Sequence, residues 1–187
     1  MALTMGRADR PMPRGAVALQ LFVLAAAVLL GGLLAMPARV NDIEAFRYFV
    51  TPNDVDAMHW IQANTPEDAL FTVNTHFWTP ALPHGTDAGY WIPYFTGRKI
   101  TAGVMLLNLA PYDYQIKILN LSRTEQRLAT DLNALTELQA QGVNYIYIGE
   151  RGNFDGLGLK AEQLKQSNKL EVVYQKGNVF IFHLKLP

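Results

Sequence analysis

The sequence contains no cysteine among its 187 residues. Without cysteine, neither a disulfide framework nor a thiol or zinc site built on cysteine can form. Charge is also sparse: charged residues make up 17% of the chain, and 16 Lys and Arg are balanced by 16 Asp and Glu. A neutral chain with a pI near 6.9 lacks the basic character of nucleic-acid-binding proteins, so no nucleic acid is expected as a partner. The high apolar content, 50%, argues against a disordered chain.

Residues typical of catalytic motifs are scarce as well. The only serines are Ser122 and Ser167, and neither lies in a G-x-S-x-G nucleophile elbow. The four histidines form no H-E-x-x-H motif. Neither a P-loop nor a complete G-x-G-x-x-G pattern is present. The sequence therefore contains no motif that names a reaction.

A long uncharged run lies near the N-terminus. Residues 15–36 carry no charge and one polar side chain, Gln20. About 20 apolar residues in a helix span the hydrocarbon core of a bilayer. Positive flanks stay in the cytoplasm, and this run is preceded by three arginines, Arg7, Arg10 and Arg14. The pattern predicts a cytoplasmic tail over 1–14, a transmembrane helix over 15–36 and a remainder that lies outside the cell membrane, in the cell envelope.

A cleaved signal peptide is the alternative interpretation of this run. The sequence Leu33-Leu34-Ala35 is similar to a cleavage site of small residues. The apolar part of a signal peptide is usually about 7–15 residues long, which is shorter than residues 15–36. The length favours an uncleaved, single-pass anchor, followed by a connector over 37–50 and an extracytoplasmic domain over 51–187.

Helix and strand patterns alternate through that domain. A helix is expected after Thr51-Pro52, because threonine can cap a helix and proline suits its first position. Further helices are expected around Tyr90–Phe95 and over 160–166, and strands over 70–74, 99–104, 143–148, 170–174 and 179–184. The last two strands form a hairpin through Gly177. The alternation predicts an α/β fold with a mostly parallel sheet and an antiparallel C-terminal hairpin.

Two segments receive more specific predictions. Residues 75–90 are interpreted as a long loop, because they contain two prolines and two glycines. The sequence Ser122-Arg-Thr-Glu125 fits a capping box at the start of a helix. It therefore predicts one short helix that ends at Leu121 and a second helix that starts at Ser122. This second helix would continue through leucines at helical spacing to a left-handed cap at Gly142.

Polar residues in the 75–90 segment allow a metal site. His76, His84 and Asp87 carry ligand types that suit zinc, and a hydrolase could use them. They are equally typical of a solvated loop. The two interpretations stay open.

The segment from Asp87 to Lys99 is dense in aromatic residues. Ring faces that stack on sugars or peptides, together with a few charges that fix orientation, are typical of a binding site for such ligands. Arg151 follows a predicted strand in a glycine-rich turn and is a candidate for contact with an anion. The candidate substrate-binding residues are Asp87, Gly89, Tyr90, Trp91, Tyr94, Arg98 and Arg151; the packing of Trp91 in a core is the alternative.

The same segment resembles a known family. Asp87-Ala-Gly-Tyr-Trp-Ile, followed by Gly97-Arg-Lys-Ile-Thr101, is similar to the C-terminal extracytoplasmic domain of multi-pass membrane glycosyltransferases of the GT-C type that use lipid-linked sugars. The oligosaccharyltransferase catalytic subunit has Trp-Trp-Asp-Tyr-Gly at this place. Trp60-Ile-Gln-Ala-Asn-Thr-Pro66 and the strand Gly142-Val-Asn-Tyr-Ile-Tyr-Ile-Gly149 are also similar to parts of these domains.

The resemblance has limits that shape the expected function. Thr86 stands where the family has its second Trp, and Ala88 replaces the Tyr, so that only Asp87 and Gly89 carry over. The family holds its polyprenyl carrier in a bundle of many helices, whereas one span is predicted here. We therefore expect a non-catalytic part that binds a glycan or peptide acceptor or docks on a multi-pass membrane partner. A divalent metal and a polyprenyl-phosphate sugar would be cofactor and donor only in a complete enzyme.

Two functions of other classes remain as alternatives at this point. One is an anchored or secreted metal-dependent hydrolase, and the other is an accessory subunit without a ligand.

Overall fold

The computed structural model describes residues 14–41, 49–102, 107–153 and 156–185. The chain divides into two compact units, Met1–Arg47 and Tyr48–Pro187.

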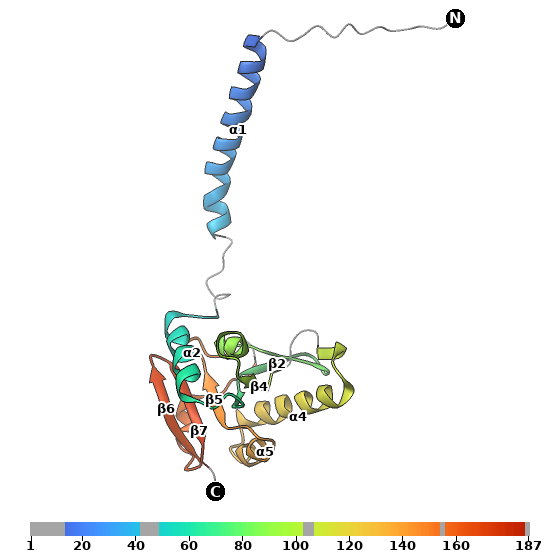
Figure 1. The fold of residues 1–187 in the computed structure, drawn as a ribbon, viewed down its shortest axis with the longest axis vertical. Coiled ribbons are helices and arrows are strands. Elements are labelled where there is room, and N and C mark those ends of the chain that lie inside the picture. The colour runs from blue at the N-terminus through green and yellow to red at the C-terminus, as the bar shows by residue number, and fades with distance from the viewer. Residues whose placement is uncertain (1–13, 42–48, 103–106, 154–155, 186–187) are drawn as a thin grey trace, which may run out of the picture. The chain divides into compact units, whose positions relative to one another are not determined.

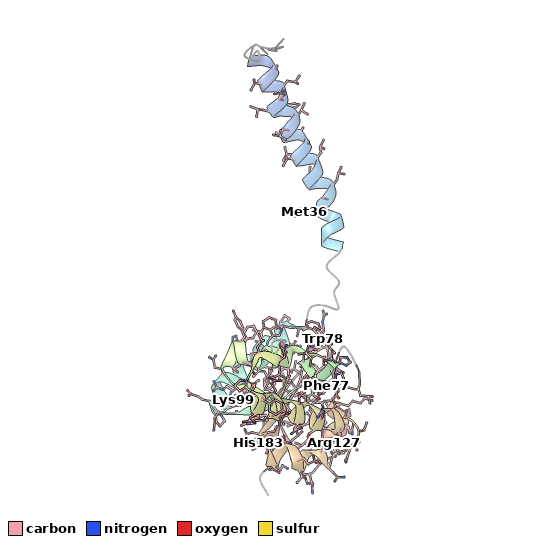
Figure 2. All side chains as sticks on the ribbon, turned by 90° about the vertical axis from the view of Figure 1, so that its right-hand side faces the viewer. Met36, Phe77, Trp78, Lys99, Arg127 and His183 are labelled. Carbon is pink, nitrogen blue, oxygen red and sulfur yellow. The ribbon has the colours of Figure 1, made fainter. Side chains whose placement is uncertain are left out.

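The first unit contains one helix, α1 (Arg14–Asn41). Its segment Gly15–Met36 has a mean hydropathy of 2.5, and none of the apolar window is buried. Over residues 15–36 of α1, exposed apolar side chains project from the helix to both sides of the view (Figure 2). A helix of this length and composition near the N-terminus fits a membrane anchor or a signal sequence.

The second unit is an α/β domain built on a five-stranded sheet of order β4-β1-β5-β7-β6 (Figure 1). The strands are β1 (Leu70–Thr72), β4 (Lys99–Ile100), β5 (Tyr145–Ile148), β6 (Leu170–Lys176) and β7 (Val179–Leu184). β1 pairs in parallel with both β4 and β5, whereas β7 is antiparallel to β5 and β6. Four strands thus share one direction, which confirms the predicted mostly parallel sheet with a C-terminal antiparallel hairpin.

Helices cover both faces of this sheet, because side chains alternate along each buried strand. Tyr145 and Tyr147 point to the face that packs against α2 (Pro52–Asn64), in one apolar cluster with Phe71 and Met58. The neighbours Ile146 and Ile148 belong to a second cluster on the opposite face. Helices α4 (Tyr112–Leu128) and α5 (Ala134–Ala140) cover that face, and α6 (Ala161–Leu164) and η3 (Leu107–Leu109) complete the cluster.

The predicted start of α2 is confirmed in detail. The Thr51 side chain accepts a hydrogen bond from the Asp54 amide at 3.4 Å, and the Asp54 carboxylate accepts from the Thr51 amide at 2.7 Å. These reciprocal bonds form a capping box. The predicted left-handed glycine after α5 is confirmed too, since Gly142 has φ +88°.

The loop predicted over 75–90 is wrong over most of its length. Strands β2 (Thr75–Thr79) and β3 (Leu82–Gly85) pair as an antiparallel hairpin, in which His76 lies opposite His84. Pro83 is accommodated because this two-stranded sheet is separate from the main sheet and has open edges among the described residues. The hairpin is followed by the 3₁₀ turn η2 (Ala88–Trp91) and the short helix α3 (Ile92–Thr96).

The helix boundary predicted at Ser122 is also wrong, since α4 runs without a break from Tyr112 to Leu128. The Ser122 hydroxyl donates to the Thr101 carbonyl at 3.2 Å instead of capping a helix, and Glu125 is buried. Tertiary contacts thus replace the local capping interaction. The chain leaves the helix at Leu128 and starts α5 at Ala134.

Candidate functional site

Buried carboxylates gather at the carboxyl ends of β1 and β5. These two strands are parallel neighbours, so that the residues after Thr72 and after Ile148 meet at one edge. Asp54, in the first turn of α2, reaches this edge and is fully buried. Its Oδ1 accepts hydrogen bonds from the Tyr147 hydroxyl at 2.8 Å and from the Glu150 amide at 2.9 Å. Asp54 therefore joins α2 to the end of β5.

Asp87, the acid of the predicted site, lies beside this cluster and is 3% exposed. Its carboxylate accepts from the Asn74 side chain at 2.7 Å, from the Gly89 amide at 2.9 Å and from the Gly149 amide at 3.2 Å. The three donors come from the segments after β1, in η2 and after β5. Asp87 thus fixes three chain segments relative to one another.

Opposing effects act on the pKa of the Asp87 carboxyl. Burial raises the pKa of Asp87 to about 7, while the hydrogen bonds from Asn74, Gly149 and Gly89 act against this rise. The nearby Asp54 carboxylate raises the pKa further, because two negative charges repel each other. The Asp87 carboxyl is therefore poised to exchange a proton near neutral pH.

Gly89 is held in the same place by close packing. A Cβ atom at this position would lie 2.7 Å from Val73, 2.8 Å from Tyr147 and 2.9 Å from Asp87. No side chain larger than hydrogen fits there without movement of the neighbours. Because Gly89 has no side chain, its backbone can approach Val73 and Tyr147 closely, and its amide reaches the Asp87 carboxylate.

A third buried acid, Glu125, comes from α4. It is 1% exposed, and its Oε2 has no hydrogen-bond partner among the described residues. Burial and the nearby Asp87 raise the pKa of Glu125 well above its ordinary value, and Thr75 partly offsets this. Both effects favour the protonated form of Glu125 over its carboxylate.

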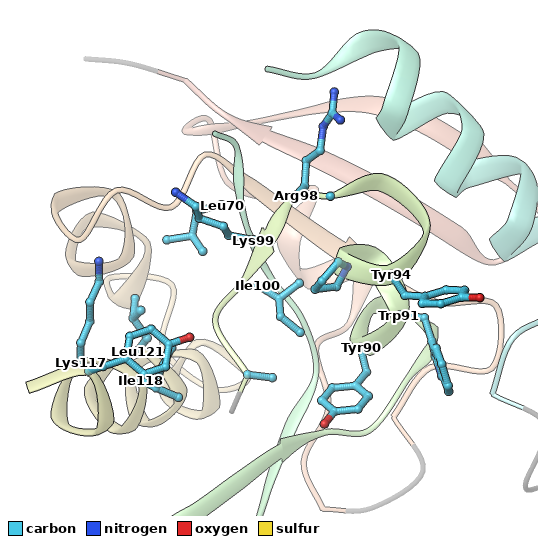
Figure 3. Close-up of a pocket in the computed structure, with 14 residues that line it drawn as sticks. Leu70, Tyr90, Trp91, Tyr94, Arg98, Lys99, Ile100, Lys117, Ile118 and Leu121 are labelled. Carbon is cyan, nitrogen blue, oxygen red and sulfur yellow. The ribbon is translucent and has the colours of Figure 1, made fainter. Parts of the chain in front are cut away.

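The aromatic residues that follow Asp87 lie elsewhere, around a cavity of about 530 Å³ beside β4. Four of the residues predicted for the binding site line it, namely Tyr90, Trp91, Tyr94 and Arg98. Figure 3 shows residues of β4 in the middle, aromatic residues of η2 and α3 on one side, and residues of α4 on the other. Trp91 is 43% exposed and Tyr94 is 79% exposed, so that both rings are accessible from solvent.

Arg98 lines the cavity but has a structural task as well. Its guanidinium donates to the carbonyl oxygens of Thr96 at 2.6 Å, Thr65 at 2.8 Å and Gln62 at 3.0 Å. Two of these carbonyls belong to the last turn and the cap of α2. Arg98 thus satisfies carbonyl groups that a helix end leaves without partners.

Sequence reasoning missed the other residues that line the cavity, among them Lys99, Tyr114 and Lys117. Lys99 lay in the aromatic segment but was not singled out, whereas Tyr114 and Lys117 come from α4. Tyr114, Lys117, Ile118 and Leu121 all line the cavity, and their spacing of three and four residues places them on one face of a helix. This spacing was the available signal, but it does not show which strand the helix face meets.

The histidines of the weak metal candidate lie on neighbouring strands. The rings of His76 and His84 are 6.3 Å apart between centroids, and the His84 ring packs on Trp78 at 4.1 Å. Asp87 is engaged with Asn74, Gly89 and Gly149. Among the residues that the structure describes, no group of three or more acidic or histidine side chains could hold a metal ion.

Arg151 lies apart from the aromatic cavity. It lines a separate depression of about 470 Å³, together with Gly149, Gly152 and Lys160. The structure therefore brings Tyr90, Trp91, Tyr94 and Arg98 together at one cavity. Asp87 and Gly89 lie in the buried network instead, and Arg151 lines a separate depression.

No protein-family model matches the chain, and no curated protein or solved structure matches it. The class that the fold and the cavity define is an α/β domain with an accessible aromatic cavity, preceded by an apolar helix.

Proposed function

We propose that this chain is a single-pass membrane protein whose extracytoplasmic α/β domain binds a glycan or acceptor in the cavity beside β4. The domain would be related to the C-terminal domains of glycosyltransferases that use lipid-linked sugars, and its own part would be binding and not catalysis. The observation that carries the proposal is the convergence of Tyr90, Trp91, Tyr94 and Arg98 on one cavity.

The chemistry of this cavity suits a saccharide. The wall formed by Ile100, Ile118 and Leu121 is apolar, and the tyrosine and tryptophan rings offer flat faces with a polar edge. Sugar rings present apolar C–H faces and hydroxyl edges, which match such surfaces. The volume of about 530 Å³ lies within the range of about 300–1,000 Å³ that is common for small-molecule sites.

The binding proposal is tested with the full chain in detergent micelles, by titration with a panel of oligosaccharides and peptides. We expect Trp91→Ala and Tyr94→Ala to weaken binding about three- to tenfold, because each removes a stacking surface. Trp78→Ala is the matched control, since Trp78 is 51% exposed but does not line the cavity. No binding by the wild-type chain, or equal losses in all three variants, would contradict the proposal and favour an accessory role without a ligand.

The anchor is tested separately, because α1 also fits a signal sequence. We propose that the N-terminus stays cytoplasmic and that the protein resides in the cell membrane. N-terminal sequencing of the membrane-extracted protein should give a start before Gly15. A mature protein that starts near Met36 would show that the segment is cleaved.

A further inference from the structure

The charges around the cavity are all of one sign. Three of its lining residues are cationic, Arg98, Lys99 and Lys117, and none is acidic. The domain as a whole has slightly more acidic than basic side chains over residues 48–187. The concentration of positive charge at this cavity is therefore local and does not follow from the composition of the domain.

The three cations differ in their partners. The Arg98 guanidinium is engaged with three backbone carbonyls. Lys99 and Lys117 are exposed, and the side chain of neither forms a hydrogen bond or an ion pair with a described residue. Asp113 precedes Lys117 by one helical turn, a spacing that permits an ion pair, yet none joins them. Two ammonium groups thus remain available to a ligand.

These two lysines belong to different elements that both line the cavity. Lys99 extends from β4, and Lys117 extends from α4, on the helix face that carries Ile118 and Leu121 (Figure 3). A ligand that stacks on the tyrosine rings and lies on the apolar wall would meet two positive charges at the rim of the cavity. Positive charges at a cavity attract anions and fix their orientation more than they increase total affinity.

We propose that the cavity selects an anionic saccharide, one that carries a carboxylate or phosphate group, over its neutral counterpart. This inference rests on the proposed glycan-binding function and adds the ligand class. Lys99 and Lys117 pair with the anionic group, and the aromatic and aliphatic residues hold the sugar ring. Salt weakens this preference, because the pairs are exposed to solvent.

The experiment uses the full chain in nanodiscs of phosphatidylcholine, which carries no net charge. Trp fluorescence or calorimetry follows titration with a glucuronic-acid oligosaccharide, its glucose counterpart, glucose 6-phosphate and inorganic phosphate. We expect the acidic sugars to bind at least threefold more tightly than glucose counterparts at low salt. Lys99→Ala and Lys117→Ala should each lower the affinity for acidic sugars about two- to fivefold and leave the neutral sugar within twofold.

Lys185→Ala is the matched control, because Lys185 is an exposed lysine outside the cavity whose side chain has no described partner. It should change neither affinity. Equal affinity for acidic and neutral sugars would overturn the inference and leave the proposed glycan binding intact. Inorganic phosphate that binds as tightly as glucose 6-phosphate would overturn it too, since the sugar would then contribute nothing. No binding of any saccharide would contradict the proposed function itself.

Discussion

The segment from Asp87 to Arg98 contributes to two regions with opposite character. The buried network at the ends of β1 and β5 holds Asp87, whose carboxylate is almost inaccessible and has three hydrogen-bond donors. The cavity beside β4 displays Trp91 and Tyr94 to solvent, together with lysines that have no described partner. A few residues of chain thus separate side chains that maintain the fold from side chains that can meet a ligand. Polarity alone does not distinguish the two roles.

The largest effect should come from Asp87→Ala in the buried network. The substitution leaves the donors of Asn74, Gly89 and Gly149 without their acceptor, and each unsatisfied buried group costs about 1–3 kcal/mol. We expect a loss of about 3 kcal/mol or more in the free energy of unfolding, measured by denaturant titration of the full chain in detergent. Asp113→Ala, on the exposed face of α4, should cost about 0.5 kcal/mol or less. Similar losses for both would mean that Asp87 is not a structural residue.

The next effect concerns the pH dependence of stability. Burial raises the pKa of Asp87 in the folded state from 3.8 to about 7 and raises the pKa of Glu125 well above its ordinary value of 4.5, so that the folded state binds more protons than the unfolded chain once the pH exceeds these ordinary values. The free energy of unfolding should therefore fall as the pH rises from about 4.5 to 7, by up to about 1.4 kcal/mol per pH unit for each group. The Asp56 carboxyl, whose pKa is lowered by Lys176, affects only the range below 3.8.

Glu125→Gln isolates one part of this pH dependence. Glutamine resembles the protonated acid and cannot ionise, so the variant should lose less stability than the wild type as the pH rises above the ordinary pKa of a glutamate, 4.5. Chemical denaturation at a series of pH values measures the difference. A variant that loses stability as steeply as the wild type would show that Glu125 does not carry the buried proton.

A smaller effect is expected for Gly89→Ala. The added methyl group would overlap with Val73, Tyr147 and the Asp87 carboxylate, and such overpacking typically costs about 1–3 kcal/mol. Gly97→Ala provides a comparison, because Gly97 has open space around it but a φ of +75°, which costs about 1–2 kcal/mol for a residue with a Cβ atom. Thermal unfolding of both variants measures the costs. A negligible cost at Gly89 would mean that the backbone there can shift.

Arg98→Lys should have an intermediate effect on stability, because Arg98 both lines the cavity and supports the end of α2. Lysine cannot reach three carbonyls in the fork geometry that the guanidinium uses, so we expect a loss of about 1–2 kcal/mol in stability. Lys99→Ala, one residue later, should change stability by about 0.5 kcal/mol or less. Equal stability of Arg98→Lys and the wild type would assign Arg98 to the cavity alone.

The smallest effect on stability is expected in the cavity. Trp91→Ala removes a ring that is 43% exposed, so it should lower the unfolding free energy much less than Asp87→Ala does, by about 1 kcal/mol or less. Denaturant titration compares the two variants directly. A large loss for Trp91→Ala would show that this ring belongs to the core and would break the distinction between the two regions.

The sequence by itself determined the elements whose causes are local. The uncharged run of residues 15–36 is long enough for α1, the Thr51 cap and Pro52 start α2, and Gly177 permits the hairpin of β6 and β7. Alternation of helices and strands was sufficient for the fold class. These features depend on neighbours within a few positions, which a linear sequence displays directly.

The tertiary structure alone decided which side chains meet across the sheet. A helix start at Ser122 is locally plausible, but the hydroxyl donates to Thr101 and α4 continues through it. Asp87 and Trp91 lie close together in the chain, yet Asp87 is buried among backbone amides and Trp91 is exposed to solvent. Lys117 and Lys99 line the same cavity only because α4 and β4 meet there. Such pairings join residues far apart in sequence, and their physical basis is the packing of elements and not the propensity of any one of them.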